Sequence, residues 1–570
     1  MRRGRRLIVF FFFFGLLVWF LTRDVGPEIQ PESVLVLDLS GRYVEAAEPS
    51  LIGRLLGDRR QSFVSVWGEM RKVERDDRIT GVVVRIRRMD LAWGMAQELR
   101  DSLLELRKSG RRTIAYLETG ALGANREYYI ATGADEIVIS PGTTSPLIGL
   151  GMEFLFLGGL WEKIGAGIET VGSGEYKSGA ETIAGTKMSP AYREMATSLL
   201  DSAYDQFVAG ISEGRNLTPE RVRELVDRAP ITAEELQEVG LVDAVGHLDE
   251  AVKRAGGGEV VEAEDYARVG LEDVDFEPVG TIALVYGSGT VLMGEGSSSP
   301  TGSVVLTSDT VSRALEEAAE DPEVDAIVFR IDSPGGSPLA SDIVWRAAEK
   351  ARENGKPLIA SVSNYAASGG YYVLCGADAV VASPGSLVGS IGVFVMRPVI
   401  GGLLEKLGIG FDSMTRGRSA ELMMMTRPLT QVGRERLMEE ILATYDLFVK
   451  RVSDGRDLTP AEVHEIGRGR VWTGAQGLEN GLVDELGGLR VAIDRAKVAA
   501  GLGADADVKL VPYPMPKTLV QQFSSALQGS IARATPRLVL PEQLRRLEAF
   551  VTTLPQGTPL LVPPFMVEIR

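Results

Sequence analysis

The chain is poor in cysteine and histidine, and these two shortages exclude several kinds of site. Cys375 is the single cysteine among 570 residues, which excludes an intrachain disulfide framework and a cysteine-rich metal site. Because Cys375 lies among apolar residues, we expect it to be a buried core thiol. The two histidines, His247 and His464, both lie away from glycine-rich turns, which disfavours a Ser-His-Asp triad. We expect no metal or other cofactor.

The chain also lacks an excess of positive charge. Its formal net charge of −17 argues against nucleic acid as a partner, because phosphate binding needs a basic face. With 45% hydrophobic and 24% charged residues, the composition is that of an ordinary globular protein. A chain of this length is too long for one core and predicts several domain-sized units.

Positive charge and a long apolar run do occur together at the N-terminus. Residues 1–6 include four arginines, and residues 7–21 are uncharged, with five consecutive phenylalanines. The pattern fits a cleavable signal peptide or a retained anchor, and the absence of a small-residue cleavage pattern after Leu21 favours an anchor. By the positive-inside rule, the arginines stay in the cytoplasm. We therefore expect a single-pass protein of the inner (plasma) membrane, held in lipid by this anchor, with its bulk on the extracytoplasmic side.

The remainder of the chain repeats itself. Residues 214–220 (GRNLTPE) recur as residues 455–461 (GRDLTPA), and residues 240–243 (GLVD) recur unchanged as residues 481–484. Such a long repeat period indicates a tandem duplication. We expect four parts, namely an anchor at residues 7–22, a first repeat at 31–270, a second repeat at 278–510 and a tail at 511–570. In the tail, residues 538–550 fit either an ordinary surface helix or an amphipathic helix that binds membrane or a neighbouring subunit.

Both repeats alternate apolar, strand-like runs with helical segments. The strand-like runs are residues 81–86, 113–117 and 136–139 in the first repeat, and residues 326–331, 358–362 and 379–382 in the second. Helical segments at residues 93–108 and 339–354 lie between them. This alternation predicts an α/β fold with a largely parallel sheet in each repeat.

Ser368 stands out as a candidate nucleophile. It lies in a Ser-Gly-Gly turn between the strand-like run at residues 358–362 and the apolar residues 371–375. A strand-to-helix turn with small residues exposes a side-chain oxygen and lets a substrate backbone approach closely. The alternative is a serine that only caps a helix.

The two repeats differ where chemistry would occur. Asn125 stands opposite Ser368, so the first repeat lacks the serine, whereas Arg418 stands opposite Lys177, so the second repeat lacks the lysine. A serine hydroxyl needs a neighbouring base, and a lysine can act as one if burial lowers its pKa. Arginine stays protonated and cannot do this. Lys177 is therefore the candidate base, and the alternative is a solvated loop lysine.

A second glycine turn could bind a developing oxyanion. Residues 333–336 (SPGG) follow the strand-like run at 326–331, and the first repeat has no such turn. Glycine amides in a turn after a strand are suitable donors for the negative oxygen of acyl transfer. We assign the donors to the amides of Gly335 or Gly336 together with that of Gly369.

Five short motifs carry a resemblance to a known family. They are residues 176–178 (YKS), 333–336 (SPGG), 367–371 (ASGGY), 389–393 (GSIGV) and 471–474 (VWTG). With them, residues 31–500 resemble the long, duplicated form of the signal peptide peptidase A (protease IV) family of membrane-anchored Ser-Lys peptidases.

The resemblance implies a Clp/crotonase-like fold with Ser368 as nucleophile, Lys177 as general base and Ser390 in a supporting role. It also implies a homotetramer that cleaves hydrophobic peptides, such as the remnants of signal peptides. Two other functions remain open at this point. One is an acyl-CoA enzyme of the crotonase type, in which the glycine amides would hold a thioester, and the other is a non-catalytic membrane scaffold.

Overall fold

The computed structural model describes residues 27–45, 61–120, 122–296 and 304–514. The predicted anchor at residues 7–22 and the predicted helix at residues 538–550 lie outside the described residues. Within the described ranges, no helix combines the length and the apolar character that crossing a membrane requires.

The first half of the chain builds a seven-stranded sheet in which every neighbouring pair of strands is parallel. The strand order is β2-β1-β3-β4-β5-β7, and β8 pairs with β1. The strands are β1 (Ser33–Val44), β2 (Gln61–Ser62), β3 (Ile79–Asp90), β4 (Arg112–Leu117), β5 (Glu136–Ile139), β7 (Ala244–Val245) and β8 (Val260–Glu262). The three strand-like runs predicted in this half are confirmed as β3, β4 and β5.

The second half builds an eight-stranded sheet of the same kind. Its order is β17-β15-β13-β12-β9-β19, with β14 between β13 and β18, and only the β15–β17 pair is antiparallel. The strands are β9 (Gly280–Ser288), β12 (Ala326–Ser333), β13 (Leu358–Ala367), β14 (Ala379–Ala382), β15 (Leu387–Gly389), β17 (Val471–Thr473), β18 (Glu485–Leu486) and β19 (Val508–Tyr513). The predicted α/β fold with largely parallel sheets is therefore confirmed in both halves.

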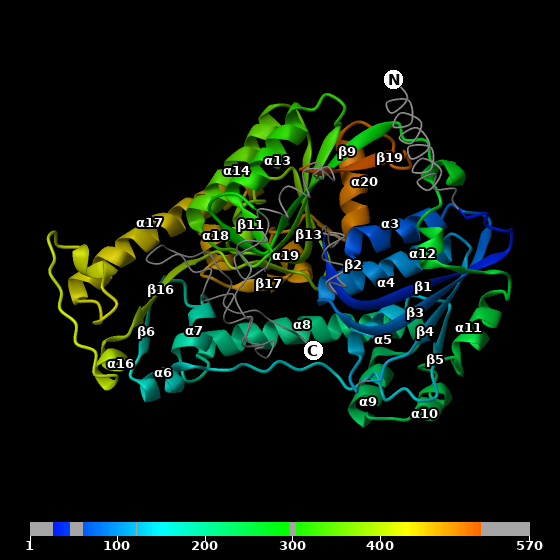
Figure 1. Ribbon diagram of the computed structural model, residues 1–570, viewed down its shortest axis with the longest axis horizontal. Coiled ribbons are helices and arrows are strands. Elements are labelled where there is room, and N and C mark those ends of the chain that lie inside the picture. The colour runs from blue at the N-terminus through cyan, green and yellow to red at the C-terminus, as the bar shows by residue number, and fades with distance from the viewer. Residues whose placement is uncertain (1–26, 46–60, 121, 297–303, 515–570) are drawn as a thin grey trace, which may run out of the picture.

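Helices connect the strands and cover the sheets (Figure 1). In the first half they are α3 (Phe63–Val73), α4 (Trp93–Lys108), α5 (Asn125–Ala131), α6 (Gly158–Ile164), α7 (Gly179–Ala184), α8 (Pro190–Arg215), α9 (Pro219–Arg228), α10 (Ala233–Glu238), α11 (Leu248–Ala255) and α12 (Ala263–Tyr266). In the second half they are α13 (Ser308–Glu320), α14 (Pro338–Glu353), α15 (Gly369–Tyr372), α16 (Gly401–Lys406), α17 (Gln431–Arg456), α18 (Pro460–Ile466), α19 (Gly474–Glu479) and α20 (Leu489–Ala499).

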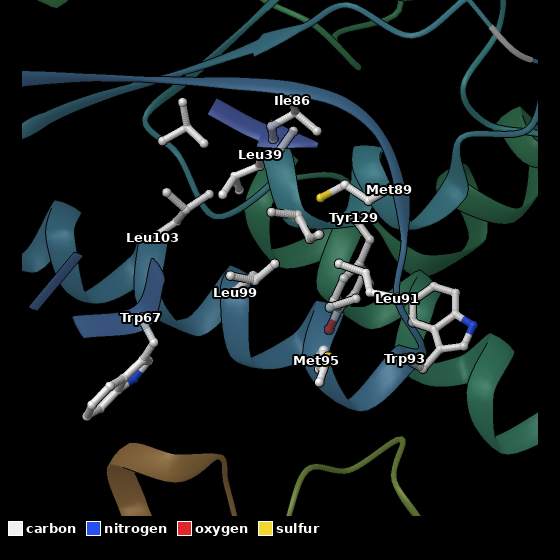
Figure 2. Close-up of a cluster of buried hydrophobic side chains, with 14 of the residues drawn as sticks. Leu39, Trp67, Ile86, Met89, Leu91, Trp93, Met95, Leu99, Leu103 and Tyr129 are labelled. Carbon is white, nitrogen blue, oxygen red and sulfur yellow. The ribbon is translucent and has the colours of Figure 1, made fainter. Parts of the chain in front are cut away.

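The core of the first half lies between α4 and the sheet. Figure 2 shows Leu99 and Leu103 on the face of α4 that is turned towards Leu39 of β1 and Ile86 of β3. All four side chains are fully or almost fully buried. Burying a leucine or isoleucine side chain contributes about 1.5–3 kcal/mol. This packing fixes α4, whose first turn also contacts the second half of the chain.

The duplication extends to individual hydrogen bonds. The Tyr128 hydroxyl donates to the carbonyl oxygen of Leu241 at 2.6 Å, and the Tyr371 hydroxyl donates to that of Leu482 at 2.8 Å. The alignment that places Asn125 opposite Ser368 also places Tyr128 opposite Tyr371. The same buried contact has therefore been kept in both halves.

One strand pair joins the two halves. The strand β6 (Gly167–Ser173) belongs to the first half, and it pairs antiparallel with β16 (Val393–Val399) of the second. Figure 1 shows β6 and β16, with α6 and α16, at one end of the molecule. Because Lys177 follows β6 closely, this pair carries a segment of the first half onto the second.

Candidate active site

Ser368 is held in a strained backbone conformation directly after β13. Its φ of 57° lies in a region of backbone conformation that residues other than glycine rarely adopt. The Ser368 N–H donates to the carbonyl oxygen of Gly389 at 2.7 Å, and its own carbonyl accepts from the N–H groups of Tyr371 and Tyr372. Ser368 occupies the N-cap position of α15, but its side chain makes no capping hydrogen bond. The capping alternative therefore does not account for the hydroxyl.

Lys177 lies in the short connection between β6 and α7. The neighbouring Tyr176 N–H donates to the carbonyl oxygen of Arg468 at 3.0 Å, which ties this connection to the second half. The Lys177 Nζ lies 2.7 Å from Ser368 Oγ, 2.7 Å from the carbonyl oxygen of Ser390 and 2.9 Å from Ser390 Oγ. The structure thus brings the predicted nucleophile, base and supporting serine together at one point.

The surroundings of Lys177 favour its neutral form. The residue is 7% exposed, and burial lowers the pKa of its amine well below the ordinary value of 10.5. Its three hydrogen-bond partners are oxygens of two serines, with no carboxylate among them. A neutral amine can accept the proton of a hydroxyl, which an ammonium cannot do. The position is not that of a solvated loop lysine.

Ser390 is itself fixed by the second half. It follows β15 with a φ of 54°, and its N–H donates to the carbonyl oxygen of Arg470 at 2.7 Å. Both its hydroxyl and its carbonyl oxygen contact Lys177 Nζ, so the backbone conformation of Ser390 helps to orient the amine.

The second glycine turn is clamped to β10 (Thr290–Leu292). The Val291 N–H donates to the carbonyl of Gly335, and the Val291 carbonyl accepts from the N–H of Ser337, each at 2.9 Å. A Cβ on Gly336 would lie 2.1 Å from the Val291 carbonyl oxygen, so only glycine fits there. The strand β12 leads to this turn and β13 leads to Ser368. Because the two strands are parallel, both turns lie at the same end of the sheet.

The three glycines predicted to bind the oxyanion differ in whether their N–H groups already donate a hydrogen bond. The Gly335 N–H donates to Ser333 Oγ at 3.2 Å. The Gly336 N–H makes no hydrogen bond to another described residue, and the Gly369 N–H opens α15, where no carbonyl of the helix can accept it. A Cβ on Gly369 would lie 3.0 Å from Gly336 N, so these two backbone segments are in close contact.

The equivalent position in the first half is occupied differently. Asn125 replaces the serine, and its carboxamide donates to the Gly149 carbonyl at 2.9 Å and accepts from the Ile148 N–H at 3.1 Å. Arg418, the counterpart of Lys177, is exposed. The place around Asn125 therefore has no nucleophile, and the residue of the second half that corresponds to Lys177 is an arginine, which cannot act as a base.

Two charged residues of β12, the buried Arg330 and the half-buried Asp332, were not predicted from the sequence. Arg330 of β12 is fully buried and forms ion pairs with Glu45 at 2.9 Å and Glu98 at 2.7 Å, both from the first half. Asp332 accepts hydrogen bonds from the Asn364 side chain and the Tyr365 N–H. The sequence carries one signal for Asp332, because an arginine replaces it in the first repeat.

Comparisons with known proteins bear on this arrangement of residues. The profile described as "Peptidase family S49" matches residues 105–261 and 350–503. "Serine protease SPPA, chloroplastic" from Arabidopsis thaliana is 31% identical over 515 residues, which cover 88% of this chain and 74% of that protein.

The chain belongs to peptidase family S49. "Protease 4" of Salmonella typhi is 28% identical over 569 residues, covering 95% of this chain and 89% of that protein. "Protease 4" of Haemophilus influenzae is 28% identical over 533 residues, covering 88% and 85%. This S49 chain is thus a serine peptidase of the long signal peptide peptidase A type, with two S49 segments as a duplication requires. The alternatives of an acyl-CoA enzyme and a non-catalytic scaffold are set aside.

Among solved structures, a mutant ClpP1 chain from Listeria monocytogenes covers 37% of this chain and 94% of its own length at 11% identity. Its TM-score of 0.22 is too low to support an argument. The finer Clp/crotonase-like class of this S49 peptidase therefore stays a prediction.

Proposed function

We propose that this S49 peptidase is a membrane-anchored endopeptidase that works through a Ser-Lys dyad, with Ser368 as nucleophile and Lys177 as general base. The observation that carries the proposal is the 2.7 Å distance between Lys177 Nζ and Ser368 Oγ, in surroundings that favour a neutral amine. Proton transfer to a positioned base is what a serine hydroxyl needs in order to attack a peptide carbonyl.

In the proposed reaction, Lys177 acts as the base and then as the acid in both the formation and the hydrolysis of an acyl-enzyme. Lys177 takes the proton of Ser368 while the serine oxygen bonds to the peptide carbonyl carbon. The N–H groups of Gly336 and Gly369 donate to the resulting oxyanion. Lys177 then gives its proton to the departing amine, which leaves an acyl-enzyme on Ser368. Lys177 next takes a proton from a water that attacks the ester, and it returns this proton to the Ser368 oxygen as the acid product leaves.

The proposed substrates are hydrophobic peptides, including the remnants that remain in the membrane after signal peptides are cleaved. This part of the proposal rests on the family resemblance and on the apolar segment at residues 7–21, which would hold the enzyme beside such substrates in the inner membrane. The catalytic halves would then lie on the extracytoplasmic side.

We also propose that the enzyme assembles as a homotetramer. The pair of β6 and β16 supports this, because each strand has a counterpart in the other half. Residues 158–164 (GGLWEKI) recur as residues 401–407 (GGLLEKL). By this correspondence residues 150–156 match β16, and residues 410–416 match β6. Neither counterpart pairs with another strand in the described chain.

The two unpaired counterparts fit each other chemically. In the register of the β6–β16 pair, Met152 would lie opposite Met414 and Leu155 opposite Phe411. Leu155 is 65% exposed and Met414 is 90% exposed, which is unusual for apolar side chains. Pairing of residues 150–156 of one copy with residues 410–416 of the next would cover them. The contact joins different surfaces, so copies would add until a ring closes.

Replacement of each proposed catalytic residue tests the dyad. Ser368→Ala and Lys177→Ala should each reduce kcat/KM for a hydrophobic fluorogenic peptide by a factor on the order of 10³ or more, because the two residues act as a unit.

The matched controls are Ser383→Ala, which removes another buried serine of the second half, and Lys72→Ala, which removes another buried lysine of the first half. Both controls should retain turnover. Near-normal turnover by Ser368→Ala or Lys177→Ala in a folded enzyme would overturn the proposal.

A further inference from the structure

The pairing between β12 and β13 breaks next to the site. Ile331 pairs with Val362, but the next pair is Ser333 with Ala366, so the single residue Asp332 stands opposite residues 363–365. Extra residues on one strand form a bulge, which leaves backbone groups without strand partners and redirects the strand that follows. Here the redirected strand leads to Ser368.

The Asp332 carboxylate fills this break. One oxygen accepts from the Tyr365 N–H at 3.2 Å, and the other accepts from the Asn364 side-chain amide at 3.0 Å. The Asn364 carbonyl oxygen in turn accepts from the N–H of Met95, in the first turn of α4, at 3.1 Å. Asp332 thus connects both strands of the second half to the half that supplies the lysine.

The position of Asp332 along the chain gives these bonds their importance. The turn with Gly336 begins at the residue after Asp332, and Ser368 lies three residues after Tyr365. A side chain that bonds across the break therefore fixes the oxyanion turn against the nucleophile turn. Among the described residues, no other side-chain hydrogen bond joins the ends of β12 and β13 that lead to the two turns.

The first half supplies an internal comparison. Arg87 stands at the place of Asp332, and its side chain pairs instead with Asp38 on β1 at 2.6 Å. There the β3–β4 pairing ends at Ile86, the counterpart of Ile331, and does not resume after Arg87. The half without a serine thus lacks both the carboxylate and the resumed pairing that follows it in the second half.

We infer that Asp332 is a positioning residue, which sets the distance between the Gly336 amide and Ser368 by accepting hydrogen bonds across the β12–β13 break. The inference rests on the proposed dyad. Without Asp332 the break can relax, and the two turns move relative to each other. A displacement of about 1 Å between reacting groups can cost about 100-fold in rate.

Two substitutions at Asp332 separate this role from a general need for a negative charge at this place. Asp332→Ala should lower kcat by about 10- to 100-fold, with KM within about twofold of the original value. Asp332→Asn keeps an oxygen that can accept from the Tyr365 N–H but loses the bond from the Asn364 amide, so it should recover part of the lost kcat. Amide hydrogen exchange at Tyr365 should become faster in Asp332→Ala and stay slow in Asp332→Asn.

Glu98→Gln is the control, because Glu98 is a buried carboxylate of the same region that pairs with Arg330 and makes no bond across the break. It should leave kcat within about threefold of the original value, even if it lowers stability. Normal kcat in Asp332→Ala, equal losses in Asp332→Ala and Asp332→Asn, or the same loss in Glu98→Gln would overturn the inference. Failure of the dyad would appear separately, as turnover by Ser368→Ala, and the Tyr365 exchange test does not depend on it.

Discussion

At the residue scale, the site depends on a lysine that is buried among neutral partners. Among the described residues, Lys177 Nζ forms hydrogen bonds only with oxygens of Ser368 and Ser390, so no carboxylate of this part of the chain pairs with its positive charge to offset the loss of water. Such a position is unfavourable for an ordinary lysine and suits one that must act as a base. It also has a measurable effect on stability.

Replacement of Lys177 by methionine should stabilise the fold at neutral pH. Burial lowers the pKa of Lys177 in the folded enzyme, whereas the unfolded chain keeps the ordinary value of 10.5. Between these two values the unfolded chain binds a proton that the folded chain does not, so stability is lost as pH falls through this window. Lys177→Met removes this loss. Denaturant unfolding should be measured as a function of pH. The free energy of unfolding of Lys177→Met should exceed that of the unsubstituted enzyme at about pH 8, and the difference should shrink towards pH 10.5.

Lys72→Met is the control for that experiment, since Lys72 is equally buried but donates to the carbonyls of Tyr266 and Val269. It should destabilise the enzyme at every pH. A gain for Lys177→Met that does not change with pH, or a loss at pH 8, would contradict a neutral Lys177.

Ser368 and Lys177 could be identified from the sequence, but Asp332 could not. The duplication makes the first two conspicuous, because each survives in one repeat only and belongs to a recognisable short motif. Asp332 acts through a break in strand pairing, and such a break depends on the register of two strands that are far apart in sequence. The replacement by Arg87 marks the position without revealing what the side chain contacts.

At the scale of elements, the apolar runs predicted six strands, three in each large sheet, and the connection between the halves was missed. Strands β5 and β14 begin and end at the predicted residues, because buried parallel strands are short, continuous apolar runs. The pairing of β6 with β16 was not foreseen. That pairing joins two halves whose relative placement is set by tertiary contacts and not by local sequence.

A disulfide across the proposed contact between copies tests the strand pairing. Residues directly opposite in an antiparallel pair have Cβ atoms about 4.5–5.5 Å apart, close to the separation that a disulfide needs. Leu155→Cys combined with Phe411→Cys in one chain should therefore give covalently linked multimers, up to a closed tetramer, on oxidation. Non-reducing gel electrophoresis with mass measurement provides the readout. The native Cys375 is buried and should contribute little background.

The control pair is Leu155→Cys with Asp412→Cys, which shifts one partner by one residue and points it to the opposite face of the strand. It should link poorly. Equal linking by both pairs, or no linking by the first pair while the protein sediments as a tetramer, would show that the copies meet through other surfaces.

At the scale of the whole molecule, the site exists only because two unequal halves are docked. The first half has kept the lysine and lost the serine to Asn125, and the second has kept the serine and has the exposed Arg418 in place of the lysine. The buried Arg330, paired with two carboxylates of the first half, helps to hold the halves together. Removing one partner of such a buried pair typically costs about 3–5 kcal/mol.

Covalent labelling of the full-length enzyme in detergent tests the central claim most directly. A fluorophosphonate should modify Ser368 alone, as located by peptide mass spectrometry, and the labelling rate should rise with pH as Lys177 loses its proton. In Lys177→Ala the rate should fall by about 100-fold or more and lose this pH dependence. Labelling of a different serine, or an unchanged rate in Lys177→Ala, would contradict a catalytic pair shared between the two halves.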